Sequence, residues 1–375
     1  MRSEKRDDKS DNHHGDEGNP LTSCLLPLTM KFDTAPAPHL KPMNTVGKVM
    51  RQVLYALAPA TVAYVWYFGW GIVIQMLIAT VFALLAETVM LLLRDRPVKP
   101  FITDYSAVVT AVLLAWAMPP TAPWWLVAIG VMFAIVFAKH LYGGLGYNLF
   151  NPAMAGYVVL LISFPQEMTS WLRPEMLVDD DNHLTFGQTL ATIFTGSFPA
   201  GVTVDAVTSA TPLDYLRTQL AGNRTLLEIR EHALFGDFGG KGWEWIGNFL
   251  VLGGIWLMIQ RVIRWQIPAG VLLGLGGMAF IFYTLDPGSH ASPGFHIFSG
   301  AAILCAFFIA TDPVSAATTE KGRFIYALGI GILIYVIRSW GGYPDGVAFA
   351  VLLMNMAAPL IDHYTKPRTY GHDRP

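Results

Sequence analysis

Long apolar stretches dominate this chain and constrain its fold more than any other feature. Hydrophobic residues make up 53% of the 375 residues and charged residues only 14%, a composition typical of integral membrane proteins. A helix needs about 20 apolar residues to cross a bilayer, and fewer where its ends are lined by protein. The segments that qualify are residues 52–69, 71–93, 104–119, 123–139, 150–165, 244–260, 268–285, 296–311, 324–338 and 345–361. We therefore predict an all-α integral membrane protein with about ten transmembrane helices.

The basic residues of the connections predict the orientation, because Lys and Arg concentrate on the cytoplasmic side of a membrane. Every second connection or chain end carries such residues: Lys48 and Arg51, then Arg94, Arg96 and Lys99, then Lys139, then Arg261 and Arg264, then Lys321 and Arg323, then Lys366 and Arg368. Among the alternate connections, the short ones carry only Arg338, and the long one, residues 166–243, is acidic. Both termini are therefore predicted to be cytoplasmic and the long loop periplasmic. Span-end tryptophans such as Trp124, Trp243 and Trp340 are expected in the headgroup layer.

The two halves of the chain resemble each other weakly. The segment 110–119 is similar to 304–313, and Tyr142-Gly-Gly is similar to Trp340-Gly-Gly. With five spans in each half, the second copy must be inverted, and such repeats place binding sites near the midplane at their interface. The predicted parts are a disordered cytoplasmic tail and interfacial lead-in (1–45), a first five-helix repeat (46–165), the periplasmic loop (166–243), a second five-helix repeat (244–362) and a cytoplasmic tail (363–375).

A hydroxyl-rich turn in the long loop is the most distinctive motif of the chain. It reads Asp205-Ala-Val-Thr208-Ser209-Ala210-Thr211-Pro-Leu-Asp. Threonine followed by proline and an acid is a typical helix start, with Thr211 as the N-cap. The same residues resemble the site at which the RnfD/NqrB family of membrane flavoproteins carries FMN esterified through its phosphate. The two interpretations are compatible, because a phosphate at a helix N-terminus meets free N–H groups and the positive end of the dipole.

The resemblance to this family covers about residues 40–365. It implies covalent FMN at Thr211, with Asp205, Thr208, Ser209 and Ala210 as the surrounding attachment sequence. The family also has a Gly-Ala-Thr variant, and Ser209 replaces that glycine here, a small change that should not prevent flavinylation. The periplasmic position of the loop would expose Thr211 to an exported flavin transferase.

A glycine-rich segment before residue 152 forms a second candidate site. Asn148 and Asn151 are two amides that can hydrogen-bond the edge of a ring, although a turn with an asparagine cap explains them equally well. The Asn-x-x-Asn-Pro pattern resembles an element beside the non-covalent riboflavin of the NqrB branch. On that resemblance the two residues become neighbours of a second, non-covalent riboflavin or FMN.

Two acidic residues fall at membrane depth. Burying a charge in a membrane costs at least about 2.5 kcal/mol, so such residues usually face a cavity or a partner. Glu87 lies in an apolar run and Asp312 in the broken segment Thr-Asp-Pro. They are candidates for a cation pathway, and the alternative is a structural role, such as a salt bridge between Glu87 and Arg94.

Several functions are excluded. Two cysteines, Cys24 and Cys305, cannot hold an iron–sulfur cluster or a thiolate zinc site, and we expect no metal site. A net charge of −2 gives no basic surface for nucleic acid. The one glycine-rich segment, residues 143–146, does not follow a strand, so the chain has no dinucleotide-binding fingerprint.

The resemblance therefore implies a flavin-carrying subunit of an ion-translocating ferredoxin:NAD oxidoreductase of the Rnf type, in a bacterial inner membrane. Electrons would reach FMN from another FMN-bearing subunit, iron–sulfur subunits would belong to the same complex, and electron flow would drive export of Na⁺ or H⁺. No complete activity is expected of the chain alone. The alternatives are an NqrB-type subunit of a Na⁺-translocating NADH:quinone reductase and, in another class, a passive channel like those for urea or ammonium, which share five-plus-five inverted repeats.

Overall fold

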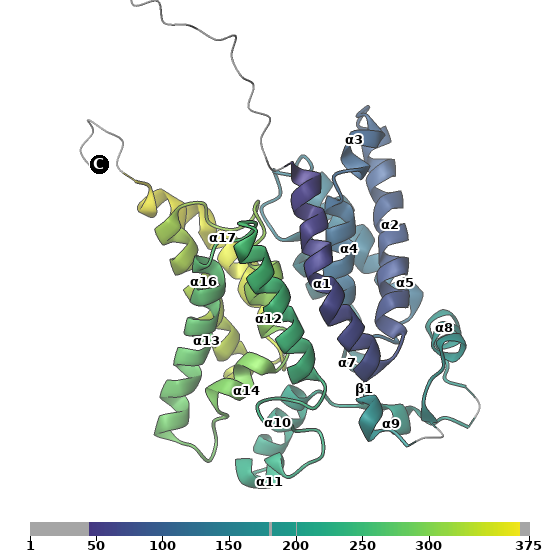
Figure 1. Cartoon of the computed structure of the whole chain (residues 1–375), viewed down its shortest axis with the longest axis vertical. Helices are drawn as coiled ribbons and strands as arrows, with labels where there is room; N and C mark the ends of the chain where they lie inside the picture. Colours follow the sequence, from purple (N-terminus) through teal and green to yellow (C-terminus); the bar gives the residue numbers. More distant parts are fainter. Residues whose placement is uncertain (1–44, 180–181, 200, 368–375) are drawn as a thin grey trace, which may run out of the picture. The chain divides into compact units, whose positions relative to one another are not determined.

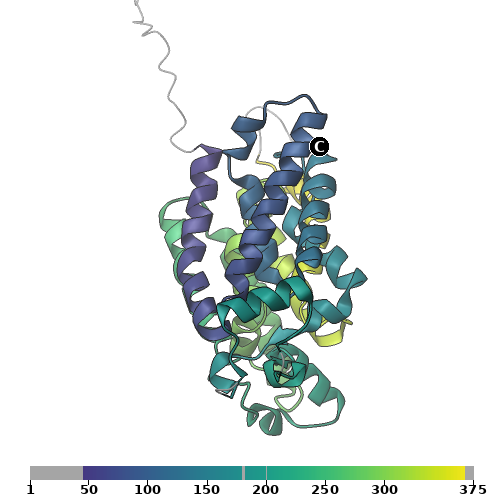
Figure 2. The same ribbon diagram turned by 90° about the vertical axis from the view of Figure 1, so that its right-hand side faces the viewer.

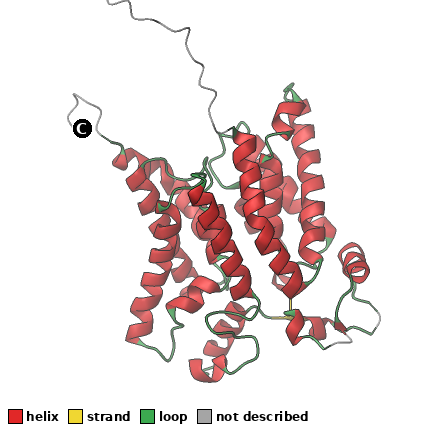
Figure 3. Cartoon of the chain, viewed as in Figure 1, coloured by secondary structure: helices red, strands yellow, loops and turns green. Residues whose placement is uncertain are grey.

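The computed structural model describes residues 45–179, 182–199 and 201–367, and most of them are helical (Figure 3). The prediction of a disordered tail concerns residues 1–44 almost entirely, and these lie outside the described residues. Most of the predicted C-terminal tail, from residue 368, lies outside them as well.

Each predicted span coincides largely with helical residues, but the eighth, residues 296–311, is divided among three short helical elements. The first five are α1 (Val46–Phe68), α2 (Gly71–Leu93), α4 (Ser106–Ala117), α5 (Trp124–Met132) with the π-helix η1 (Phe133–His140), and α6 (Pro152–Ser163); the short α3 (Val98–Ile102) precedes α4. The second five are α12 (Trp243–Ile259), α13 (Gln266–Leu285), α14 (Pro293–Phe298) with α15 (Ala302–Leu304) and the π-helix η4 (Cys305–Ile309), α16 (Glu320–Trp340) and α17 (Val347–Thr365).

Four of these helices, α2, α13, α16 and α17, are long and apolar enough to cross a membrane. Among the described residues, the shorter apolar helices are Ser106–Ala117, Trp124–His140, Pro152–Ser163 and Trp243–Ile259, and prolines account for part of the shortening. The helix α4 ends just before Pro119 and Pro120, and α6 begins at Pro152, since proline lacks the N–H that an interior helical position needs. The described residues thus form a helical protein with several helices of membrane-spanning character.

Glycines allow the longest helices to pack closely. In Figure 1, α1 runs beside α12, and α13 beside α16. A side chain at Gly253 of α12 would collide with the backbone of Ala56 in α1, and one at Gly331 of α16 with the backbone of Val271 in α13. Small residues at such crossings let helices approach closely enough for backbone contact.

The segment between α6 and α12 is folded. It contains α7 (Pro165–Thr169), β1 (Trp171–Leu172), η2 (Glu175–Leu177), α8 (Phe186–Thr195), α9 (Val204–Val207), β2 (Thr208–Ser209), α10 (Pro212–Ala221) and α11 (Leu226–Arg230). The two strands pair antiparallel, with Trp171 opposite Ser209. A small apolar core that includes Leu213, Leu216 and Ile229 holds α10 against α11, and α8 runs crosswise to α2 (Figure 2).

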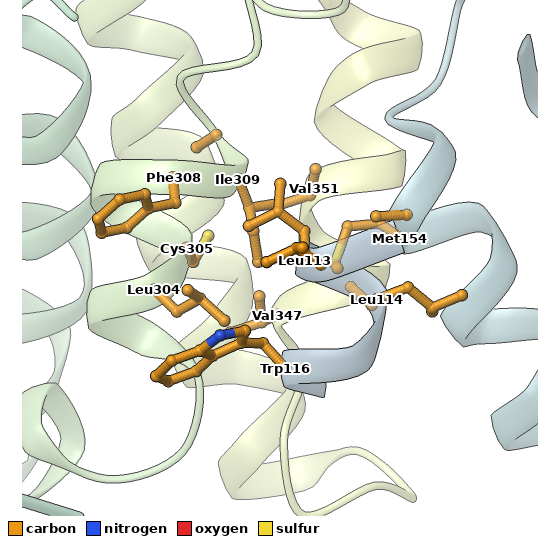
Figure 4. Packing of buried hydrophobic residues seen from close by; sticks show 14 of the residues in the cluster. Leu113, Leu114, Trp116, Met154, Leu304, Cys305, Phe308, Ile309, Val347 and Val351 are labelled. Carbon is orange, nitrogen blue, oxygen red and sulfur yellow. The ribbon is translucent and has the colours of Figure 1, made fainter. Parts of the chain in front are cut away.

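The main hydrophobic core continues across the contact between the two groups of helices. Figure 4 shows Leu113, Trp116 and Met154 of the first group facing Ile309 and Val347 of the second. Because the π-helix η4 lies at this contact, an irregular helix forms part of the boundary between the two groups.

Candidate functional site

Thr211 begins the helix α10, as the sequence predicts. Its backbone is extended (φ −65°, ψ 156°), Pro212 occupies the first helical turn, and the Thr211 hydroxyl accepts a hydrogen bond of 3.3 Å from the N–H of Asp214. The predicted N-cap is therefore confirmed. Because β2 ends at Ser209, the strand pair fixes the backbone two residues before the Thr211 hydroxyl.

A cavity of about 370 Å³ lies beside Thr211. Its lining comes from both groups of helices and from the segment between them. Aromatic side chains form much of its wall: Trp116, Tyr157, Trp171, Trp243, Phe298 and Tyr343. A volume in the range of about 300 to 1,000 Å³ with an apolar, aromatic lining is typical of sites that bind an organic cofactor.

One polar atom on this wall has no partner among the described residues. The side chain of Trp116 is 5% exposed, and its indole Nε1 is buried without a hydrogen-bond acceptor. Buried indole N–H groups usually find an acceptor, so this donor is available to a carbonyl or ring nitrogen of a bound molecule. The sequence shows Trp116 only as part of a repeat segment and does not indicate this position.

Trp243 is the first residue of α12 and belongs to an aromatic cluster. Its ring packs against Phe68, Tyr64 and Trp171, with ring centroids 4.5, 5.7 and 5.5 Å away respectively. These neighbours come from distant parts of the chain, so the sequence could not indicate the cluster.

The other residues of the attachment motif lie around the start of α10. Asp205 is exposed on α9, and the Thr208 hydroxyl donates to the carbonyl of Val204 at 2.8 Å. Ser209, Ala210 and Thr211 line a second, very small pocket that Lys241 also lines. Lys241 was not singled out in the sequence, and its position beside Thr211 follows only from the fold.

Arg338, which the sequence places in an outer connection, is buried. Its side chain is 1% exposed and forms an ion pair with Asp345 at 3.1 Å. Since Arg338 belongs to α16 and is buried in an ion pair, it is not an exposed base of a connection.

A smaller cavity of about 100 Å³ brings together three residues that the sequence singled out. Asn148, Asn151 and Asp312 line it, and so does Lys139. Thr211 does not line it, so Thr211 and these three predicted residues line different cavities.

Both asparagines have structural bonds. Asn151 caps α6 by accepting from the N–H of Met154 at 3.2 Å, and its amide donates to the Ile309 carbonyl of η4 at 3.2 Å. Asn148 donates to the Phe150 carbonyl at 3.0 Å, while its Oδ1 is buried without a partner among the described residues. The asparagine cap is therefore present, and a cavity this small has room for a few water molecules but not for a flavin ring.

Glu87 is paired, but not with Arg94. Lys139 Nζ lies 2.8 Å from both carboxylate oxygens of Glu87 and donates to the Ser106 hydroxyl at 2.9 Å. The ring of His140 also approaches Glu87, at 3.1 Å. Lys139 is 2% exposed and belongs to η1, so it is not an exposed base of a connection. Arg94 instead donates to the His140 carbonyl. Residues 52 positions apart meet here, a contact without a local sequence signal.

Asp312 bends the chain after η4. Its carboxylate accepts from the Ser315 hydroxyl at 2.6 Å and from the N–H of Val314 at 3.4 Å. Within the described residues, no group of three or more His, Cys, Asp or Glu side chains is placed to hold a metal ion.

Comparison with known proteins identifies the family. Residues 33–371 match the sequence model of the NQR2, RnfD, RnfE family. The chain belongs to this family. The match includes both groups of helices and the segment that carries Thr211, so the family that the Ser-Ala-Thr motif predicts is confirmed.

Curated relatives are similar over nearly their whole length. The D subunit of an ion-translocating oxidoreductase complex from Alcanivorax borkumensis is 53% identical over 345 residues, which is 92% of this chain and 98% of the relative. Proteins of the same description from Aliivibrio salmonicida and Vibrio cholerae are each 51% identical, over 353 and 350 residues, covering 92% of this chain and 100% of each relative.

Proposed function

We propose that this chain is the RnfD-type member of an ion-translocating oxidoreductase complex, and that it carries FMN esterified to Thr211. The description of its relatives supports the first part. The second part rests on one observation: the Thr211 hydroxyl lies at the start of α10, beside an aromatic cavity of about 370 Å³. A flavin held there would accept and donate electrons.

The residues around Thr211 suit a flavin phosphate and ring. The helix α10 directs the positive end of its dipole toward the ester position, and Lys241 adds a positive charge beside it. The aromatic walls can stack on a planar ring, and Trp116 Nε1 can donate to a ring acceptor.

A second, non-covalent flavin beside Asn148 and Asn151 remains a prediction. The cavity there is too small for a flavin ring as the side chains lie, and Asn151 already has two structural hydrogen bonds. Binding would require the helices around this cavity to separate.

The arrangement of ten spans in two inverted repeats also belongs to this proposal, with both termini in the cytoplasm and the Thr211 segment in the periplasm. A shared irregularity supports the repeat. The third and eighth spans each begin with a short helix and break at a residue of positive φ, Tyr105 (61°) before α4 and Gly300 (65°) before α15. An aspartate bonds the backbone N–H just after each break: Asp104 bonds Ser106, and Asp345 bonds Ala301.

Partner subunits follow from the complex to which the relatives are assigned. The second FMN-bearing subunit would meet the segment around Thr211, and iron–sulfur subunits would belong to the same complex. The Nqr branch of the family would retain the flavin and add quinone reduction. A passive channel is disfavoured, because it has no use for an attachment threonine beside an aromatic cavity.

The proposal is tested by measuring whether flavin stays covalently bound to the denatured chain. In cells that contain the flavin transferase, we expect the wild-type band to fluoresce under ultraviolet light after denaturing electrophoresis. Thr211→Ala should be dark, because no hydroxyl remains to form the ester. Thr208→Ala and Ser209→Ala, which alter neighbouring hydroxyls, are the matched controls and should remain fluorescent. A fluorescent Thr211→Ala band, or a wild-type mass without the flavin increment, contradicts the proposal.

A further inference from the structure

An ion pair lies at the larger cavity, with Asp345 in the cavity wall. Arg338, near the end of α16, donates from Nε and Nη2 to one oxygen of Asp345 at 3.2 and 3.1 Å. The Arg338 side chain is 1% exposed and that of Asp345 22%. Ionisable residues inside membrane helices are costly and usually mark functional positions.

The pair holds the broken part of the eighth span. Arg338 donates from Nη1 to the carbonyl of His296 at 2.5 Å and from Nη2 to that of Ser299 at 2.9 Å. The second oxygen of Asp345 accepts from the N–H of Ala301 at 2.7 Å. The two side chains thus satisfy the backbone groups that the break between α14 and α15 leaves free.

The site that carries Thr211 packs directly on this break. A Cβ on Gly300 would lie 2.5 Å from Asp345 Oδ2 and 2.6 Å from a methyl group of Leu213, a residue in the first turn of α10. Ser299, Gly300, Ala301 and Asp345 all line the cavity, whereas Arg338 does not. The carboxylate therefore lies at the cavity wall and the guanidinium behind it.

We propose that Arg338 and Asp345 are a positioning pair that sets the reduction potential of the flavin in this cavity. The inference rests on the function proposed for Thr211. Uptake of two electrons and one proton leaves the flavin ring one unit more negative. A buried guanidinium favours that charge and a carboxylate opposes it, and both act strongly where water is excluded. In the ion pair the two effects partly cancel, so the reduction potential lies between the values that either charge alone would give.

The test exploits the opposite signs of the two charges. The full chain is purified from cells that contain the transferase, and its covalent flavin is titrated with dithionite, which supplies the electrons. Arg338→Gln leaves an unpaired carboxylate, so the potential should fall. Asp345→Asn leaves an unpaired guanidinium, so it should rise. For each variant we expect at least a tenfold change in the ratio of reduced to oxidised flavin at fixed potential, about 30 mV for a two-electron couple.

Two further variants separate charge from packing. The double variant Arg338→Gln/Asp345→Asn removes both charges and should titrate near the wild type, as should Arg338→Lys, which keeps the charge. Shifts of the same sign in the two single variants, or no shift in either, overturn the inference, since loss of packing has no reason to change sign. If neither Asp345→Asn nor the double variant accumulates, the pair is structural and the inference is also overturned. Gel fluorescence of the same samples distinguishes failure of this inference from failure of the proposed attachment, because a dark wild-type band contradicts attachment at Thr211 itself.

Discussion

Lys241 is the basic side chain that shares a small pocket with Thr211. An ester of FMN would place a negative phosphate there, and the ammonium group would be attracted to it. We expect Lys241→Gln to slow flavin incorporation by about two- to fivefold, because a partly exposed charge pair contributes about 1 kcal/mol or less. The measurement is a time course of gel fluorescence per chain after induction of the transferase.

Two control variants show whether the charge of Lys241, at its own position, assists the ester. Lys241→Arg keeps the charge and should incorporate flavin at nearly the wild-type rate. Arg224→Gln removes an exposed base just after α10 and should have no effect. A Lys241→Gln protein that is flavinylated as fast as the wild type would show that the ammonium group does not assist the ester.

Single residues show where sequence reasoning stops. The N-cap role of Thr211 could be predicted because Thr-Pro-x-Asp is a local pattern, and the structure confirms it. The partner of Glu87 could not be predicted, because Lys139 lies 52 positions away and Arg94 is nearer in sequence. Trp116 and Lys241 were missed for the same reason: their importance comes from neighbours that only the fold brings close.

Among the elements, the continuous helices were predicted well and the broken ones less well. Apolar length alone reveals α2 or α13, since a long apolar run has few other ways to fold in a membrane. The break between α14 and α15 lies inside an apolar run, and its only local signal is Gly300, whose φ of 65° suits glycine. The sequence therefore indicates a single eighth span where the structure has a short helix, a turn and a π-helix.

The connections between elements allow a direct test of orientation. With Cys24 replaced by serine, a single cysteine can be placed at Gly187 of α8, where a Cβ meets open space, or at the exposed Pro97 between α2 and α3. We expect Gly187→Cys in intact spheroplasts to react with a membrane-impermeant maleimide and Pro97→Cys to react only after lysis. The native Cys305 is buried in η4, so the parent without Cys24 should remain unlabelled. Reversed labelling would contradict both the orientation and periplasmic flavin transfer.

At the scale of the whole molecule, two cavities lie on either side of the same elements. Asn151 at the start of α6 and Phe308 of η4 line the smaller cavity, while Met154 of α6 and Ile309 of η4 line the larger. Coupling of electron transfer to ion movement requires an element whose equilibrium both processes affect. The irregular helix η4 contacts both cavities, and its Ile309 carbonyl accepts from Asn151, so it is positioned for that role.

Glu87 can join a cation pathway only if its ion pair with Lys139 can be exchanged. Glu87→Gln alone would leave a buried ammonium group without its partner, which costs about 3 to 5 kcal/mol, so we expect poor accumulation of that variant. Glu87→Gln/Lys139→Met removes both charges and should restore folding and the covalent flavin. Asp312→Asn should also fold, because an amide oxygen can still accept the Ser315 hydroxyl that Asp312 now binds at 2.6 Å.

These two folded variants test the coupling. With the whole complex reconstituted in vesicles, electron transfer and cation uptake can be measured together. If Glu87 and Asp312 line the pathway, uptake per electron should fall in both variants while gel fluorescence stays at the wild-type level, since Thr211 lies at the other cavity. Unchanged uptake per electron in both would assign Glu87 to a structural ion pair and Asp312 to the turn after η4. A defect in Asp312→Asn alone would place the cation route along η4 and away from α2, because Glu87 would then serve only to neutralise Lys139.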